Sequence, residues 1–203
     1  IVTGFTPPQM KDILIVRLSA IGDVALATSL LPGLRAKWPE ARIHWVTEDM
    51  GAEVLRGNPE IDELIVLPRK KWKALLKSWR LFAFLREIGT ARKRLRDIRA
   101  EMAIDAQGLL RSAFWAFASG ARVRIGIRPQ EGSRLLLTQS IAVGPNPTGR
   151  MCHGYRLLLE ELGIDVPFSL CLRPTDESRS AAAKAMDAGT SAPVFFFPFT
   201  TRP

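Results

Sequence analysis

The sequence predicts an α/β fold, in which a mainly parallel, doubly wound sheet carries helices on both faces. Strand-like and helix-like stretches alternate from residue 13 onward, as is typical of parallel sheets. The first apolar run, residues 13–18, is interrupted only by Arg17, which suits a strand buried on both faces. With 203 residues, 47% of them hydrophobic, the chain can bury the core that such a fold requires.

Each further element is predicted from a local pattern. Residues 23–38 have helical spacing, although Pro32 should kink or divide that helix. Apolar runs bounded by polar or turn residues predict strands at 42–48, 63–68, 102–108 and 122–127. The remaining stretches predict helices at 49–56, 72–99, 109–118 and, after a loop rich in Pro and Gly at 144–149, 153–162.

The C-terminal part predicts the start of a second domain. A short strand is expected at 169–173, and Thr175 or Asp176 can cap an alanine-rich helix that ends at Gly189. The apolar stretch at 193–203 predicts a buried strand with nothing after it to pair with. We therefore divide the chain into a domain at 1–173 and a segment at 174–203 that contains a linker helix and the first strand of another sheet.

The positive charge is concentrated in one segment. The chain has a formal net charge of +9, and residues 69–99 contain 12 of its 29 basic residues but only 2 of its 20 acidic ones. The rest of the chain is nearly neutral, with 17 basic and 18 acidic residues. Such a segment attracts phosphates, whether they belong to nucleic acid, anionic lipid or a phosphorylated glycolipid.

Two observations bear on location and metal content. Every apolar stretch is far shorter than the roughly 18 to 20 residues that cross a bilayer, and no N-terminal signal is visible, so we expect a cytoplasmic protein. Cys152 and Cys171 lack the spacing of a zinc site and are too few for a disulfide framework. We expect reduced thiols in the core and no zinc site formed by these two cysteines.

Asp23 lies where the first strand gives way to a helix, at an edge of the sheet that commonly binds ligands. Only Gly22 is present where a dinucleotide fingerprint needs three spaced glycines, and a carboxylate in the first turn would repel a phosphate. Two roles remain open. Asp23 can cap the helix, or it can act as a general base, since a carboxylate is ionised at pH 7 and partial burial raises its basicity.

Five stretches, in order along the chain, resemble a known family. They are "ILIVRLSAIGDV" at 13–24, "IHWVTED" at 43–49, "LPRKKWKA" at 67–74, "IDAQGLLRSA" at 104–113 and "EGSRLLL" at 131–137. Together they resemble the lipopolysaccharide heptosyltransferases of glycosyltransferase family 9, and most closely the heptosyltransferase I group. The resemblance covers nearly all of residues 11–203.

The resemblance implies a GT-B enzyme with two Rossmann-like domains. Such an enzyme transfers L-glycero-D-manno-heptose from ADP-heptose to the Kdo region of lipid A, with inversion and with neither a cofactor nor a metal. Residues 1–173 would be the acceptor-binding domain, and 174–203 would begin the donor-binding domain. Family members are longer, so the resemblance implies that this chain is C-terminally truncated and inactive alone. It also implies a cytoplasmic enzyme bound peripherally to the anionic inner face of the inner membrane.

The resemblance assigns roles to individual residues. Asp23 would be the general base, in a turn where Ser19 and Gly22 contact the acceptor. The residues after the third strand that would engage the anionic acceptor are Arg69, Lys70, Lys71 and Lys73. Further acceptor-binding candidates are Asp105, Gln107, Arg128 and Arg134, of which Asp105 and Gln107 can instead fix their own loop. Thr200 and Thr201 match the start of the loop that binds the donor phosphates.

Some alternatives stay open at this level. The apolar residues of 72–99 can pack on the domain or form an interfacial element at a membrane. A transferase of the same family that acts on a later heptose or another acceptor would share the motifs. A nucleic-acid-binding module is disfavoured, because the segment has bulky apolar residues at helical spacing and no recognised binding motif. His153 and Cys152 have no third catalytic partner, so an ordinary helix start is expected there.

Overall fold

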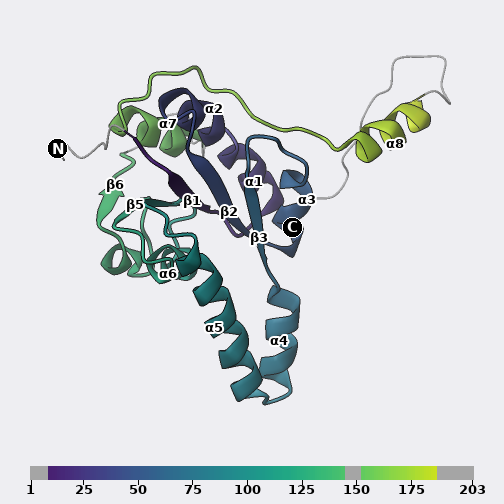
Figure 1. Cartoon of the computed structure of the whole chain (residues 1–203), viewed down its shortest axis with the longest axis vertical. Helices are drawn as coiled ribbons and strands as arrows, with labels where there is room; N and C mark the ends of the chain where they lie inside the picture. The colour runs from purple at the N-terminus through teal and green to yellow at the C-terminus, as the bar shows by residue number, and fades with distance from the viewer. Residues whose placement is uncertain (1–8, 145–151, 187–203) are drawn as a thin grey trace. The chain divides into compact units, whose positions relative to one another are not determined.

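The structure, a computed structural model, describes residues 9–144 and 152–186. The chain divides into two compact units, residues 1–173 and 174–203, and each is described by itself. The first unit contains a six-stranded sheet with helices on both faces (Figure 1). The predicted α/β fold is therefore confirmed. What each unit binds stays a prediction.

All neighbouring strands of the sheet are parallel, and their order is β3-β2-β1-β4-β5-β6. The strands are β1 (Asp12–Val16), β2 (Arg42–Glu48), β3 (Glu63–Leu67), β4 (Met102–Asp105), β5 (Val123–Ile127) and β6 (Gln139–Ile141). This is the order of a Rossmann-like sheet, in which the winding direction reverses between β1 and β4. The five strands predicted between residues 13 and 127 are present, whereas the short edge strand β6 was not predicted because its three residues form no apolar run.

Side chains of the central strand alternate between two cores. Ile13 and Ile15 belong to one cluster, which the helices α1 (Ile21–Ala27), α2 (Leu30–Lys37), α3 (Asp49–Leu55) and α7 (Cys152–Glu161) cover. Leu14 and Val16 belong to the other, beneath α5 (Leu81–Asp97) and α6 (Leu110–Ala118). Because both faces are covered, every residue of β1 is buried, and each large apolar side chain contributes roughly 1.5–3 kcal/mol.

The helix predicted at 23–38 is divided, as expected, but not at the proline. It breaks at Thr28 and Ser29, whose hydroxyls donate hydrogen bonds to the carbonyl oxygens of Ala25 and Leu26 at 2.6 and 2.7 Å. Pro32 lies in the first turn of α2, where a helix does not need the missing N–H. Side-chain hydrogen bonds to the backbone therefore end the first helix.

The single helix predicted at 72–99 is wrong, because the segment forms a hairpin of α4 (Arg69–Lys77) and α5 (Figure 1). The N–H of Arg80 bonds to the carbonyl of Leu75, and that of Trp79 to the carbonyl of Leu76. These two bonds form a Schellman motif, with Trp79 at φ 54° in the left-handed position that glycine usually occupies. The left-handed conformation costs a residue with a Cβ about 1–2 kcal/mol.

The strand predicted at 169–173 is also wrong. The backbone N–H of Cys171 donates to Thr28 Oγ1 at 3.1 Å, and its carbonyl accepts from Asn58 Nδ2 at 2.6 Å. Side chains of the first unit therefore satisfy this backbone, and no strand pairs with it in the described residues. Cys171 is a buried free thiol and Cys152 a half-buried one, in agreement with the prediction of reduced cysteines.

The second unit is described only for its helix α8 (Asp176–Met186) and the residues before it. The Thr175 hydroxyl accepts a hydrogen bond from the N–H of Ser178 at 3.1 Å, so Thr175 caps the helix as one alternative predicted. The predicted helix end at Gly189 and the strand at 193–203 lie outside the described residues. Within the described ranges, no helix has both the length and the hydropathy of a membrane span.

Candidate active site

The candidate site lies at the carboxyl ends of β1 and β4, where the winding of the sheet reverses. In open parallel sheets this reversal leaves a crevice that commonly binds ligands. The chain leaves β1 through residues 17–20 and enters α1, and it leaves β4 through residues 106–109 and enters α6. The two loops are joined directly, because Gln107 Oε1 accepts a hydrogen bond from the N–H of Leu18 at 3.0 Å.

Asp23 is held by an ion pair and does not cap its helix. Its Oδ2 lies 2.5 Å from Nη2 of Arg17, and α1 has no side-chain hydrogen bond at its N-cap, Ala20. The Asp23 side chain is 35% exposed, and its Oδ1 accepts no hydrogen bond within the described part of the chain. One carboxylate oxygen is therefore fixed while the other can accept a proton from a ligand. The capping role is wrong, and the role as a base stays a prediction.

Arg17 was not predicted as a site residue, although it was noted as the one charge in the first apolar run. Its side chain is only 3% exposed, and Nη1 donates to the carbonyl oxygen of Ala106 at 2.7 Å. A buried guanidinium needs a counter-charge, and Asp23 supplies it. The sequence feature that could have indicated Arg17 is a single charged residue next to a strand predicted to be buried on both faces.

Tyr155, the single tyrosine of the chain, lies beneath this pair. Its hydroxyl donates to the carbonyl oxygen of Ala106 at 3.3 Å, beside the bond from Arg17. Burial raises the pKa of Tyr155 to about 12, and the nearby charge of Asp23 also raises it. The hydroxyl therefore stays protonated and supports the loop as a hydrogen-bond donor.

Asp105 fixes its own loop, and the prediction that it contacts an acceptor needs correction. The side chain is fully buried, and Oδ1 accepts hydrogen bonds from the N–H groups of Gln107 and Gly108, both at 3.0 Å. Burial raises the pKa of Asp105, although these bonds oppose the change. Gly108 has φ +78°, and a Cβ there would overlap the carbonyl oxygen of Ile127. Only glycine therefore fits at position 108, where the β4 loop passes close to the backbone after β5.

Gln107 remains able to reach a ligand. Its side-chain oxygen is used by Leu18, but its Nε2 has no partner in the ranges that the structure describes, and the residue is half-buried. An amide with two free donors at the carboxyl end of β4 can orient a sugar hydroxyl or a carboxylate. Its acceptor-binding role therefore stays a prediction.

Two arginines and one glutamate form a network at the mouth of the site. Glu48 Oε2 lies 2.8 Å from Nη1 of Arg69, and its Oε1 lies 2.8 Å from Nη1 of Arg111. Arg111 also donates to the hydroxyl of Ser19 at 3.3 Å, which links the network to the turn before Asp23. Since two guanidinium groups share one carboxylate, the mouth keeps a net positive charge that attracts anions. Neither Glu48 nor Arg111 was among the predicted site residues.

The predicted lysines are not drawn into this network. Lys71 pairs with Glu87 of α5 at 2.9 Å, while Lys70 and Lys73 lie exposed along α4. Gly22 is exposed, with nothing within 4 Å of the position of a Cβ, so a ligand can approach the turn closely. The structure thus brings Arg69 to the site and leaves the lysines on the hairpin.

The other predicted residues follow β5. The loop after β5 is tied to the β4 loop, because the N–H of Gln130 and the hydroxyl of Ser133 both donate to the carbonyl oxygen of Gly108, at 2.7 and 3.1 Å. Arg128, which precedes these hydrogen-bonded residues in the chain, is half-buried. Arg134 is exposed in the short 3-10 helix η1 (Ser133–Leu136). The acceptor-binding role of Arg128 and Arg134 stays a prediction. The predicted donor-binding residues Thr200 and Thr201 lie outside the described residues.

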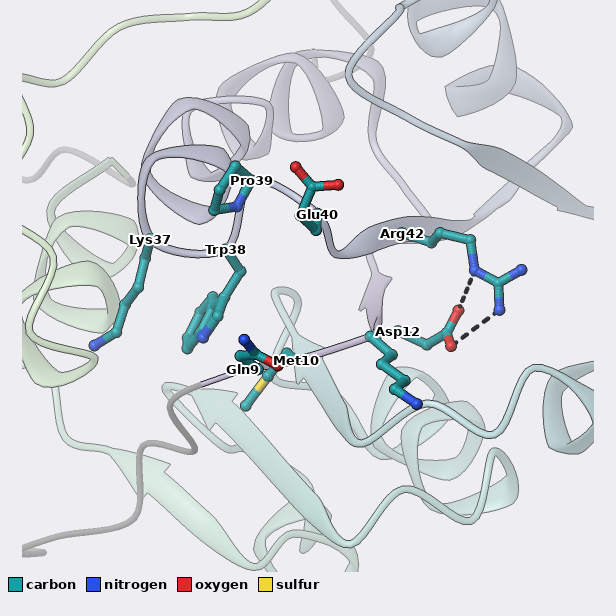
Figure 2. A pocket seen from close by; sticks show the side chains of 9 residues that line it. Gln9, Met10, Asp12, Lys37, Trp38, Pro39, Glu40 and Arg42 are labelled. Atoms are coloured by element: carbon teal, nitrogen blue, oxygen red, sulfur yellow. Dashed lines mark hydrogen bonds and ion pairs between the residues drawn. The ribbon is translucent and has the colours of Figure 1, made fainter.

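A pocket of about 650 Å³ lies at the opposite, amino edge of the sheet (Figure 2). It is lined by Gln9, Met10, Lys11, Asp12, Lys37, Trp38, Pro39, Glu40 and Arg42. Arg42 and Asp12 form an ion pair at its rim, with Nε and Oδ1 2.9 Å apart. Because ligands of parallel sheets bind beyond the carboxyl ends, we do not assign the candidate site to this pocket.

A buried histidine lies close to that edge between two acids. His44 Nε2 is 2.8 Å from Asp12 Oδ1, and its Nδ1 is 2.9 Å from Glu63 Oε2. Burial alone would raise the pKa of Asp12, but hydrogen bonds from Arg42 and His44 hold it below its ordinary value. The pKa of Glu63 is also lowered, because hydrogen bonds from Arg94 and His44 outweigh burial. This cluster joins β1, β2 and β3, and we assign it to stability.

Comparison with known proteins decides the family. The family model described as Glycosyltransferase family 9 (heptosyltransferase) matches residues 88–203, more than half of the chain. The chain belongs to glycosyltransferase family 9. This family-9 chain is 29% identical over 108 residues to Lipopolysaccharide heptosyltransferase 1 of Pseudomonas aeruginosa, a match that covers 50% of the chain and 28% of that relative.

Two solved structures share the fold of the family-9 chain. The glycosyl transferase family 9 from Veillonella parvula superposes with a TM-score of 0.67 at 24% identity, over 88% of this chain and 49% of that one. The E. coli heptosyltransferase WaaC with ADP-2-deoxy-2-fluoro heptose gives a TM-score of 0.65 at 22% identity, over 79% of this chain and 51% of that one. The family-9 chain therefore spans about half of these structures and less of the curated relative.

Proposed function

We propose that this chain is the acceptor-side half of a heptosyltransferase, which transfers L-glycero-D-manno-heptose from ADP-heptose to the Kdo region of lipid A. Family membership supports a heptosyl transfer, and the matched relative from Pseudomonas aeruginosa is called a lipopolysaccharide heptosyltransferase 1. The related E. coli enzyme was solved with an ADP-heptose analogue. The enzyme would act at the cytoplasmic face of the inner membrane.

The observation that carries the proposal is the placement of Asp23. Its carboxylate lies at the reversal point of the sheet, with one oxygen held by Arg17 and the other free among the residues described. In the proposed reaction this free oxygen takes the proton from a Kdo hydroxyl as that hydroxyl attacks the anomeric carbon of the heptose. ADP leaves from the opposite face, which inverts the configuration. Positioned general bases contribute about 10²- to 10⁴-fold to the rate.

Arg69 and Arg111 are suited to bind the acceptor. Both side chains are partly exposed, and they share the single carboxylate of Glu48, so they can donate further hydrogen bonds to an anion. Kdo carries carboxylates, and guanidinium groups bind carboxylates through paired, charge-assisted hydrogen bonds. The link from Arg111 to Ser19 places such an anion next to the turn that contains Asp23.

The acceptor proposal can be tested on the chain itself by titration with the deacylated Kdo-containing headgroup of lipid A. We expect Arg69→Gln and Arg111→Gln each to weaken binding about 10-fold or more, because each removes charge-assisted hydrogen bonds of ~1.5–3 kcal/mol. Arg122→Gln, which removes another exposed arginine, is the matched control and should bind as the unaltered chain does. Equal affinity in all four proteins would contradict the proposed acceptor site.

The catalytic proposal has to be tested in a protein that can catalyse heptosyl transfer. The expected donor-binding half is supplied by fusing the corresponding domain of the Pseudomonas aeruginosa relative, and release of ADP is measured with ADP-heptose and Kdo-lipid A. We expect the 203-residue chain alone to show negligible turnover. In the fusion, Asp23→Asn should lower kcat by about 10²- to 10⁴-fold while acceptor binding changes little. Near-normal turnover of this variant would rule out Asp23 as the base.

A different acceptor within the family is the second candidate. The motifs do not distinguish the first heptose addition from a later one, so the same fusion is assayed with an acceptor that already carries one heptose. Faster transfer to that acceptor would replace Kdo-lipid A in the proposal and leave the role of Asp23 intact.

A further inference from the structure

The tip of the α4–α5 hairpin exposes large apolar side chains. Trp79 is 85% exposed and Phe82 is 91% exposed. Leu76, Leu81 and Leu85 are also exposed, so five large apolar residues lie uncovered within ten positions of the chain. No other helix or strand in residues 9–144 and 152–186 covers them. Such a patch marks a surface that contacts a partner.

The base of the same hairpin is firmly packed. Trp72 of α4 stacks on Trp115 of α6, with ring centroids 5.6 Å apart, and Phe84 of α5 meets Trp72 edge-on at 6.5 Å. Leu95, near the end of α5, is fully buried in the core. The hairpin is therefore anchored at one end and holds its tip away from the sheet (Figure 1). Of the two alternatives for residues 72–99, packing on the domain describes only this base.

The charge at the tip has one sign. Between residues 72 and 86 the sequence contains no acid and four bases, Lys73, Lys77, Arg80 and Arg86. All four are exposed, and none has an ion-pair partner in the described part of the hairpin or the domain. Exposed Trp and Phe beside unpaired cations are the composition of elements that lie at the boundary between lipid headgroups and acyl chains.

We propose that this tip docks the protein on an anionic lipid bilayer, with Trp79 and Phe82 at the headgroup–acyl boundary and Lys77 and Arg80 against lipid phosphates. The inference deepens the proposed function, on which it rests for the need to meet a lipid-borne acceptor. Nucleic acid would neutralise the same cations but would leave Phe82 in water, so the bilayer explains both features of the tip.

The length of α4 fits this arrangement. From Arg69, at the mouth of the site, to its last residue Lys77, α4 rises roughly 12 Å at 1.5 Å per residue, and Trp79 follows two positions later. The headgroup region of a bilayer is about 5–8 Å thick. If the hairpin stands upright with Trp79 at the boundary, Arg69 lies beyond the lipid phosphates, where a headgroup sugar projects. The hairpin then acts as a spacer between the bilayer and the candidate site.

The test is flotation of the whole chain with vesicles of phosphatidylglycerol and phosphatidylethanolamine, which contain no acceptor. We expect binding to these vesicles, weaker binding to phosphatidylcholine, and little binding to duplex DNA. The double variant Trp79→Ser/Phe82→Ser should lower the partition coefficient at least about 100-fold, because two aromatic side chains no longer leave water. Lys77→Gln/Arg80→Gln should lower it roughly 30-fold on anionic vesicles, at about 1 kcal/mol per cation.

The chain offers matched controls. Leu135 is 90% exposed and Phe82 is 91% exposed. Leu135→Ser therefore removes an almost equally exposed apolar side chain elsewhere on the domain. Arg122→Gln removes an exposed cation that lies near the base of the hairpin and not at its tip. Both controls should float as the unaltered chain does. Brominated lipids should quench tryptophan fluorescence in the unaltered chain and not in Trp79→Phe, which keeps the apolar contact.

Unchanged flotation of both tip variants would overturn the inference, as would preferential binding to DNA. The inference would also be overturned if the unaltered chain did not float and instead self-associated through the tip, because a second copy of the chain would then be the partner. Since the vesicles hold no acceptor and no turnover is needed, failure of this inference leaves the proposed transferase activity standing. Failure of heptosyl transfer likewise leaves the docking result standing.

Discussion

The ion pair between Arg17 and Asp23 makes an asymmetric prediction about stability. Arg17 is 3% exposed and Asp23 is 35% exposed, so the two partners depend on each other to different degrees. Asp23→Ala leaves a guanidinium buried without its counter-charge. Arg17→Met leaves a carboxylate that water can reach, and the Ala106 carbonyl oxygen keeps its hydrogen bond from Tyr155. The first change should therefore cost more than the second.

The magnitudes follow from the exposure of each partner. Removing one member of a fully buried pair costs about 3–5 kcal/mol. Since Asp23 is one-third exposed and Arg17 keeps its bond to Ala106, we expect about 2 kcal/mol for Asp23→Ala. For Arg17→Met we expect about 1 kcal/mol or less, the contribution of one hydrogen bond. The double variant Asp23→Ala/Arg17→Met should be more stable than Asp23→Ala, because it contains no buried charge without a partner.

The assay is urea unfolding followed by circular dichroism, supported by thermal melting. A loss of ~2 kcal/mol in a domain of this size lowers Tm by about 4–8 °C. Glu161→Ala removes an exposed acid that has no hydrogen-bond or ion-pair partner in the described ranges, and it should change stability by less than about 0.5 kcal/mol. Equal losses for Asp23→Ala and Arg17→Met, or a double variant less stable than both, would refute the reasoning that the guanidinium is the buried partner.

Two further predictions concern the loops and the amino edge of the sheet. Gly108→Ala should cost about 1–3 kcal/mol more than Gly132→Ala in urea unfolding, since both positions have φ near +77° but only a Cβ at 108 overlaps a carbonyl oxygen; equal costs would show that the β4 loop can shift. The lowered pKa of Asp12 contributes stability that is present above its ordinary pKa of 3.8 and is lost as the pH falls through the folded value. The free energy of unfolding should therefore decline below about pH 4, and less steeply in Asp12→Asn; identical slopes in the two proteins would exclude this carboxyl as a source.

The fold was largely predictable because its signals are local. Continuous apolar runs and the alternation of strand-like and helix-like stretches predicted five strands of the sheet and the helices that cover it. The failures have local causes as well. A hairpin replaced one long helix because Trp79 took a left-handed conformation that no proline or glycine announced. A strand predicted at 169–173 was lost because side chains of Thr28 and Asn58 bonded its backbone.

The candidate site was predictable only in part. Motifs drew attention to Asp23, Arg69 and Gln107, whose positions follow directly from the ends of strands. They did not indicate that Glu48 would bridge two arginines, because its partners are 21 and 63 positions away and the pairing depends on how loops fold over the sheet. Nor did they indicate that Asp105 would be buried.

The amino-acid sequence by itself therefore determined the class of fold, the place of the turn that contains Asp23 and the concentration of positive charge in one segment. Only the tertiary structure decided which charges are paired and which are free. The physical reason is that hydrophobic periodicity is encoded in neighbouring residues, whereas the state of a charge depends on its burial and on partners from distant strands. Arg17 is the clearest case. Its buried guanidinium would be unfavourable alone, but the ion pair with one oxygen of Asp23 compensates its charge and holds the candidate base in place.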